Sequence, residues 1–318
     1  MKTADIVRRV EQRLGLPGVV RSLAERLAPT DLQSLLLAVY RQRSGKRRPA
    51  DVLRDYESNR FVGPSRASPA ALRAVEAALR DGLPEGIEEL ELSPVCPLGS
   101  SAVIAGLSQD WAVPTIRHTE VVSDGTNVLA LECALRRRAL LRATPRSTKA
   151  VLLCASQRLL RPQFYDQPNM LAHFRLFHVC SAGRDVGNLS FETATILTHA
   201  TAYLGAVQTV MPQLRLEFLL TDFHAHDRYS HLEQRLLDPL RATFPAVGVM
   251  VHRARETGRG YYRDLCFHIN AHTPSGQVLQ LSDGGVVDWT QKLLGDRKER
   301  LVISAISSER LATLSTGR

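Results

Sequence analysis

The sequence lacks long hydrophobic runs, paired cysteines and any apolar segment near its start. No run in the 318 residues approaches the ~20 apolar residues that span a bilayer, and MKTADIVRRVEQRLG is charged throughout, unlike a secretory signal. No CxxC pair occurs, which argues against a zinc site and a disulfide framework. We therefore expect a cytoplasmic protein without a membrane partner, with five buried thiols: Cys96, Cys133, Cys154, Cys180 and Cys266.

Several motifs of large enzyme classes are also missing. The sequence contains no P-loop, no GxSxG and no HExxH. We also find no internal repeat and no low-complexity segment. These absences argue against a P-loop nucleotide site, a serine hydrolase of the GxSxG type and a zinc protease.

The charge is strongly one-sided. Lysine and arginine number 41 against 32 aspartates and glutamates, giving a net charge of +9 and a pI of 9.7. Such a balance favours acidic partners, including nucleic acid and nucleotides. The basic residues are partly clustered, as RQRSGKRR at 41–48 and RRR at 136–138, and a solvated basic face is the competing interpretation.

Apolar spacing divides the chain into two parts. Residues 1–62 read as short amphipathic helices, a basic helical extension or small bundle, with Thr30 and Gln33 at the spacing of a capping box. Residues 63–318 alternate strands and helices, with several strands joined by hairpin-type turns. This pattern predicts an α+β fold with a mainly antiparallel sheet flanked by helices.

A long hairpin at residues 156–183 carries the most suggestive chemistry. Arg158 and Arg161 follow the first apolar run, and Phe174 lies near the start of the second. Arginines beside an aromatic ring can hold a phosphate and stack a base. Arginines in loops are also commonly solvated, so this stretch alone does not establish a ligand-binding site.

The order of six segments resembles class II aminoacyl-tRNA synthetases, and the histidyl-tRNA synthetase core in particular, over about residues 64–318. SQRLLRPQ with AHFRLF resembles motif 2, IEELELSP the motif 1 strand, and SDGT the segment P-E/D-x-T. GRGYYRDLCFHI and DGGVVDWTQKLLG resemble RGLDYY and GGRYDxL, and ISAISSERL stands where motif 3 is expected. The resemblance implies a homodimer that binds ATP with Mg²⁺ and an amino acid or other carboxylate.

Roles can be transferred only to matching positions. The resemblance implies that Arg158 and Arg161 hold phosphate, that Phe174 and Arg310 sandwich adenine, and that Arg158 and Arg259 serve catalysis. Tyr261 and Tyr262 would line the substrate pocket. The remaining substrate-binding positions are Asp124 and Thr126 for the α-ammonium, and Gly284 and Gly285 for close backbone approach.

The departures keep several functions open. Leu160, Leu176 and Cys180 replace polar residues of the family pattern, the catalytic arginine is displaced to the vicinity of Arg255 and Arg259, and Ser304 and Ser307 replace motif 3 glycines. With no anticodon-binding domain expected after motif 3, histidine charging of tRNA is not expected. Three hypotheses remain: an adenylate-forming ligase, a regulatory subunit of the ATP phosphoribosyltransferase type, and an RNA-binding protein on an inert scaffold.

A pair of histidines is a further candidate site. His224 and His226 lie two residues apart between carboxylates, which on a strand would place them on one face. No third ligand can be named from the spacing. We therefore expect a surface loop here and no metal site.

Overall fold

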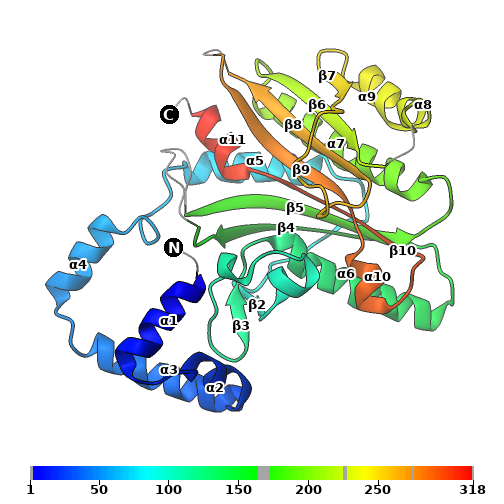
Figure 1. Ribbon diagram of the computed structural model, residues 1–318. Helices are drawn as coiled ribbons and strands as arrows, with labels where there is room; N and C mark the ends of the chain where they lie inside the picture. Colours follow the sequence, from blue (N-terminus) through cyan, green and yellow to red (C-terminus); the bar gives the residue numbers. More distant parts are fainter. Residues whose placement is uncertain (1–2, 164–171, 225–227, 274–275, 317–318) are drawn as a thin grey trace.

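The computed structural model describes residues 3–163, 172–224, 228–273 and 276–316. A single large sheet organises the core, in the order β1-β4-β5-β10-β9-β8-β6-β7 (Figure 1). Its strands are β1 (Glu88–Glu89), β4 (Val151–Leu160), β5 (His173–Arg184), β6 (Arg215–Asp222), β7 (Gly248–Val251), β8 (Leu265–His272), β9 (Val278–Val287) and β10 (Glu299–Ile306). The five central pairings are antiparallel and the two edge pairings, β1 with β4 and β6 with β7, are parallel. The predicted α+β fold is confirmed.

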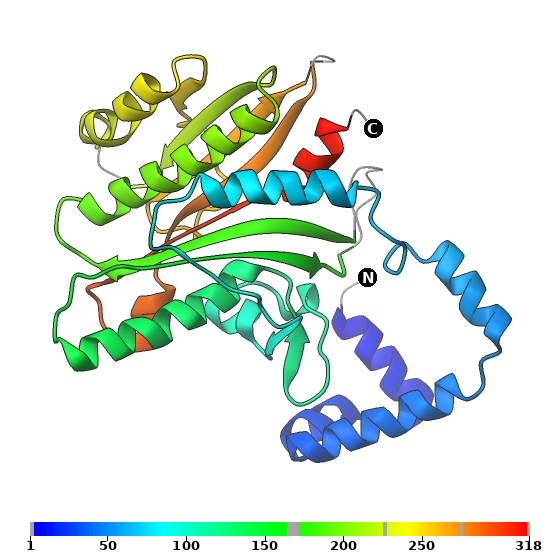
Figure 2. The ribbon, with the colours of Figure 1, turned by 180° about the vertical axis from the view of Figure 1, so that it is seen from behind.

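Helices cover both faces of this sheet. One face carries α5 (Pro69–Asp81), α7 (Ser190–Val210) and α11 (Ser308–Ser315), and in Figure 2 α5 and α7 lie in front of the sheet. The other face carries α6 (Gly125–Ala143) and α10 (Trp289–Leu294). The edge strand β7 is preceded by a short helical segment. It consists of α8 (Tyr229–Leu232), a π-helical turn (Glu233–Leu237) and α9 (Asp238–Thr243). Two hydrophobic clusters follow from this layering, one on each face. No helix in the described ranges is long and apolar enough to cross a membrane.

The predicted hairpin is present, and the predicted motif 1 strand is much shorter than expected. β4 and β5 pair without a break from Val151 with Ala182 to Leu160 with His173. In the segment IEELELSP only Glu88–Glu89 form a strand, extended by one hydrogen bond from the Leu90 N–H to the Cys154 carbonyl. A separate small hairpin follows, β2 (Val95–Pro97) with β3 (Thr119–Val121), enclosing a π-helical turn (Ser100–Ile104) and a 3₁₀ turn (Gln109–Trp111).

Residues 3–62 form an arm of helices beside the core: α1 (Thr3–Leu14), α2 (Val19–Glu25), α3 (Pro29–Ser44) and α4 (Pro49–Ser58). Figures 1 and 2 both show the arm extending away from the sheet. The capping box predicted at Thr30 is wrong, because α3 begins at Pro29 with Ala28 as its N-cap. Gln33 instead accepts a hydrogen bond from the Arg117 N–H, at 2.6 Å.

A buried histidine ties α7 to the centre of the sheet and makes stability depend on pH. His199 lies 2.8 Å from the Ser181 hydroxyl and 2.9 Å from the Ser304 hydroxyl, and Ser304 also contacts the Tyr203 hydroxyl. Burial lowers the pKa of His199 to about 3. Because the unfolded chain binds this proton near pH 6.5 and the folded chain does not, the stability contributed by neutral His199 is lost as the pH falls from about 6.5 toward 3.

We expect the free energy of unfolding to fall by about 2 kcal/mol between pH 7 and pH 5 because of this one group. Urea unfolding of the wild type and of His199→Asn at both pH values isolates the effect, since the other titrating groups are shared. The variant is less stable at pH 7 but has the shallower pH dependence. Equal pH dependences in the two proteins would contradict this assignment.

Candidate functional site

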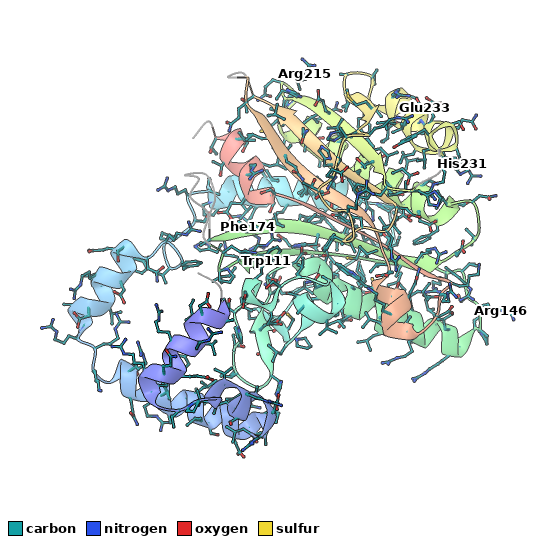
Figure 3. The ribbon with its side chains drawn as sticks, viewed as in Figure 1. Trp111, Arg146, Phe174, Arg215, His231 and Glu233 are labelled. Carbon is teal, nitrogen blue, oxygen red and sulfur yellow. The ribbon has the colours of Figure 1, made fainter. Side chains whose placement is uncertain are left out.

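A cleft of 1710 Å³ opens on the α6 face and continues past the ends of β9 and β10 to the start of α11. Figure 3 labels Phe174 on β5 and Trp111, two lining residues on the side of the core that faces the arm. Other residues that the argument uses are Ser123, Asp124, Thr126, Arg161, Leu176, Arg255, Tyr261, Tyr262, Asp283, Glu309 and Arg310. Most of the predicted binding residues therefore lie around one cavity.

The N-terminus of α6 forms one polar wall of the cleft. Asp124 is the N-cap, and its carboxylate accepts hydrogen bonds from the Thr126 N–H at 3.0 Å and from the Thr126 hydroxyl at 2.8 Å. Arg161 crosses from the hairpin: its Nε donates to the Ser123 carbonyl at 3.0 Å, and its Nη2 lies 3.5 Å from the Asp124 carboxylate. A helix N-terminus with a fixed carboxylate and a nearby guanidinium can hold a zwitterionic group.

His178 contacts the N-terminus of α6 from the β5 strand. The Gly125 N–H donates to its Nε2 at 3.2 Å, and its Nδ1 donates to the Ala155 carbonyl at 3.3 Å, which defines a neutral ring. Complete burial lowers the pKa of His178. A Cβ at Gly125 would lie 2.7 Å from the ring, so glycine is required for this contact. His178 positions the helix terminus and does not itself line the cleft.

Phe174 and two arginines form the part of the cleft suited to a planar anionic ligand. The guanidinium of Arg161 lies 5.1 Å from the centre of the Phe174 ring. Arg310, in the first turn of α11, donates to the Gln280 carbonyl, and burial lowers its pKa. Among the described residues no carboxylate pairs with Arg310. A partly buried cation without a counter-charge favours an anion or the face of a π-system as its ligand.

Arg158, the motif 2 arginine, is not brought into this cleft. Cys154, four residues earlier on the same strand, packs on the α5 and α7 face. The hydroxyl of Ser156, two residues earlier, donates to Glu76 of α5. Side chains two apart on a strand share a face, and Arg158 accordingly lies 3.1 Å from the Glu309 carboxylate of α11 and donates to Nδ1 of His173 at 3.0 Å. Arg158 is absent from the described residues that line the cavity.

Tyr261 and Tyr262 form an aromatic corner deeper in the cleft. Their rings meet edge to face at 4.9 Å, and Tyr261 also packs against Trp289. Burial, followed by the nearby Asp124, raises the pKa of the Tyr261 hydroxyl, and burial, followed by Asp283, raises that of Tyr262. Both hydroxyls are therefore neutral, and the Tyr262 hydroxyl donates its hydrogen bond to the Asp283 carboxylate.

The sequence motifs do not identify two further cleft residues beside these tyrosines, Arg255 and Asp283. Arg255 is buried and its Nη2 reaches both oxygens of Asp283, at 3.0 and 3.1 Å. Its Nη1 donates to Nδ1 of His268, whose pKa burial and this arginine lower to about 4. Burial raises the pKa of Asp283 although Arg255 opposes the shift. Arg255 had been recognised only as lying near the displaced catalytic arginine, and no pattern identified Asp283.

Arg259, the position predicted to be catalytic, lies outside the described cleft residues. Its side chain is 55% exposed, pairs with Glu256 at 3.2 Å and lies over the Phe223 ring at 4.8 Å. Its place in the cleft is taken by Arg255. The loop 257–262 thus brings Tyr261 and Tyr262 inward and leaves Arg259 on the surface.

The two predicted ligand-approach glycines serve strand packing. A Cβ at Gly284 would lie 2.5 Å from the Ser304 Cβ and 2.8 Å from the Ile303 carbonyl oxygen, and one at Gly285 would lie 2.5 Å from the Leu265 carbonyl oxygen. Neither glycine is among the described residues that line the cleft. Close approach is required here by neighbouring strands.

Gly284→Ala is expected to destabilise the protein by about 1–3 kcal/mol, because the added methyl group overpacks three adjacent strands. Gly205→Ala is the matched control: its Cβ would meet nothing within 4 Å inside α7, and alanine is the better helix former there. Urea unfolding measures both. A Gly284→Ala protein as stable as the wild type would show that the strands can separate at no cost.

The carboxylates of the cleft do not form a protein-held metal site. Asp124, Asp283 and Glu309 are each paired with an arginine, and the described part of the chain contains no group of three or more His, Cys, Asp or Glu side chains that could hold a metal ion. Of the histidine pair, His224 follows β6 with its N–H bonded to Asp222, and His226 lies outside the described residues.

Solved structures with the same architecture include two histidyl-tRNA synthetase-type chains. Histidyl-tRNA synthetase from S. aureus matches with a TM-score of 0.55 and 16% identity, over 77% of this chain and 66% of that chain. An ATP phosphoribosyltransferase regulatory subunit/histidyl-tRNA synthetase from Bacillus halodurans matches with a TM-score of 0.55 and 12% identity, over 79% of this chain and 82% of that chain. No family model and no curated protein matches the sequence. The fold is that of the class II aminoacyl-tRNA synthetases.

Proposed function

We propose that this chain, with its class II synthetase-like fold, binds ATP in the cleft and activates a carboxylate substrate as an adenylate. The observation that carries the proposal is Arg310, a partly buried cation without a carboxylate partner among the described residues, lining the same cavity as Phe174. Adenine between Phe174 and Arg310 would satisfy this cation. Arg161 then lies where it can contact the phosphates.

The reaction needs few groups from the protein. A substrate carboxylate oxygen bonds to the α-phosphorus while the bond to pyrophosphate breaks, and the charge that develops on the phosphoryl oxygens must be stabilised. We assign that role to Arg161, the hairpin arginine that reaches the cleft, in place of Arg158. Asp124 and Thr126 would receive the substrate ammonium group, with Tyr261 as the adjoining wall. Leu176 makes this pocket more apolar than the family pattern.

ATP–pyrophosphate exchange, screened across amino acids and small carboxylates, tests the catalytic part, and calorimetric titration with MgATP tests the binding part. We expect ATP binding and exchange with one class of carboxylate. ATP binding without exchange for any substrate would remove the ligase function and leave a nucleotide-binding protein. The absence of both would overturn the proposal.

A regulatory role is the second candidate, because one similar structure is a regulatory subunit/histidyl-tRNA synthetase that this chain covers over 82% of its length. Apolar residues replace polar ones at Leu160, Leu176 and Cys180, which suits a scaffold that no longer binds histidine as a substrate. A purified short ATP phosphoribosyltransferase forming a stable complex with this chain, and gaining activity in it, supports this candidate. Homodimer formation, implied by the resemblance, remains part of both candidates, and light scattering tests it.

A further inference from the structure

The N-terminal arm, residues 3–62, contains four helices but no buried side chain among its described residues. Its helices are 12, 7, 16 and 10 residues long. Helices shorter than ~12–15 residues are marginal in water unless an apolar face is packed. The arm therefore lacks the burial that would hold it in a fixed form, and a partner surface could supply it.

Apolar side chains are concentrated on this arm. Of the 24 exposed large hydrophobic side chains among the described residues, 15 lie between Ile6 and Val62. On α3, Leu35, Leu36 and Val39 are each 43–45% exposed and follow the half-buried Leu32 at the spacing of one helix face. Exposed apolar surface at this density marks a protein interaction site.

The same arm is basic, and its cations are mostly arginines. It carries 12 lysines and arginines against seven aspartates and glutamates, and 11 of the 12 are arginine. Arg41 and Arg43 line a hollow of 750 Å³ together with Leu37 and the exposed Tyr40. Neither arginine pairs with a carboxylate in the described parts of the chain. Arginine and tyrosine are enriched in protein interfaces, whereas lysine is depleted there.

We propose that the arm is the docking surface for a different protein, one that presents an acidic amphipathic helix or an equivalent acidic and apolar surface. Its apolar side chains would cover the stripe of Leu35, Leu36 and Val39, and its carboxylates would pair with Arg43, which follows Val39 by four residues on the same helix face. Charge disfavours a second copy of this chain, because the arm carries +5 and the rest of the chain +4. A nucleic acid would match the arginines but leave the apolar stripe in water.

The test places a photo-crosslinking residue, p-benzoylphenylalanine, at Leu36 of the full chain in cells of the source organism. We expect a nuclease-resistant adduct with one other polypeptide, joined through a segment of net negative charge. The same residue placed at Leu293, which is 38% exposed on α10, is the control and should not give that adduct. A nuclease-sensitive adduct, an adduct with a second copy of the chain, or no adduct would each overturn the proposal.

Binding to the purified polypeptide then separates the two contributions. Leu35→Ser with Val39→Ser, and separately Arg43→Glu, are each expected to weaken binding at least tenfold. The matched control Leu293→Ser should leave it unchanged. Because all three arm positions are exposed in the free protein, thermal unfolding of the core should not shift in the variants. Wild-type affinity in either arm variant would contradict the proposed contact, whether or not the cleft binds ATP.

Discussion

Arg310→Ala is expected to weaken MgATP binding by about 10- to 100-fold. The guanidinium lies partly buried in the cleft wall, burial lowers its pKa, and no carboxylate among the described residues compensates its charge. A desolvated cation over a ring contributes ~2 kcal/mol or more, and each ~1.4 kcal/mol is tenfold in affinity. Calorimetric titration of wild type and variant at one ionic strength measures the difference.

Arg158→Ala is the matched control for this prediction. Motif order assigns the α-phosphate to Arg158, but the side chain lies on the opposite face, against Glu309 and His173. We therefore expect its removal to change ATP affinity by less than about threefold, whereas Arg161→Ala should approach the loss seen for Arg310→Ala. A loss in Arg158→Ala as large as that in Arg310→Ala would show that the arginine reaches the ligand after all.

Arg137→Ala is expected to be the most destabilising single substitution proposed here. Arg137 and Glu299 are both fully buried, joining α6 to β10 by hydrogen bonds of 2.7 and 2.8 Å. A remaining Nη2 hydrogen bond reaches the Ser147 carbonyl at 2.9 Å. Removing Arg137 leaves the buried Glu299 carboxylate without its hydrogen-bonded partner and with only the Arg184 guanidinium, 3.6 Å away, at a cost of about 3–5 kcal/mol. Urea unfolding at pH 7 gives this difference directly.

Two controls distinguish the buried charge from the loss of packing. The double variant Arg137→Met with Glu299→Leu removes both charges while keeping much of the volume, so it should recover most of the lost stability. Arg21→Ala breaks an exposed pair whose side chains are 81% and 61% accessible, and it should cost less than about 1 kcal/mol. An Arg137→Ala protein within 1 kcal/mol of the wild type would mean that water reaches Glu299.

Local patterns identified the elements around the cleft well. The apolar runs on either side of the arginine-rich loop predicted the β4–β5 hairpin, and the resemblance of SDGT to P-E/D-x-T pointed to Asp124, which the structure places as the N-cap of α6. Such features depend on alternation and on helix-terminus chemistry, which neighbouring residues decide. The family resemblance added the order of segments. It thereby brought Phe174, Tyr261 and Arg310 to one cavity although they are far apart in the chain.

Contacts between distant segments could not be predicted in the same way. A strand exposes alternate residues on opposite faces, so a motif aligned by letters fixes the position of Arg158 but not the face to which it points. Gln33 has the spacing of a capping box, yet the Arg117 N–H, 84 residues away, is its partner. Asp283 begins the segment DGGVVDWTQKLLG but matches no residue of GGRYDxL, because its role comes from Arg255 across the fold. Ser307, in place of a motif glycine, accepts a hydrogen bond from the Arg310 N–H and caps α11.

The central claim is that the cleft between Phe174 and Arg310 is an adenine site. A crystal structure of the protein with MgATP or a non-hydrolysable analogue tests it most directly. We predict adenine between the Phe174 ring and the Arg310 guanidinium, with the phosphates directed toward Arg161. Arg158 should remain paired with Glu309. Nucleotide bound elsewhere on the molecule, or a cleft that stays empty at saturating MgATP, would contradict the claim.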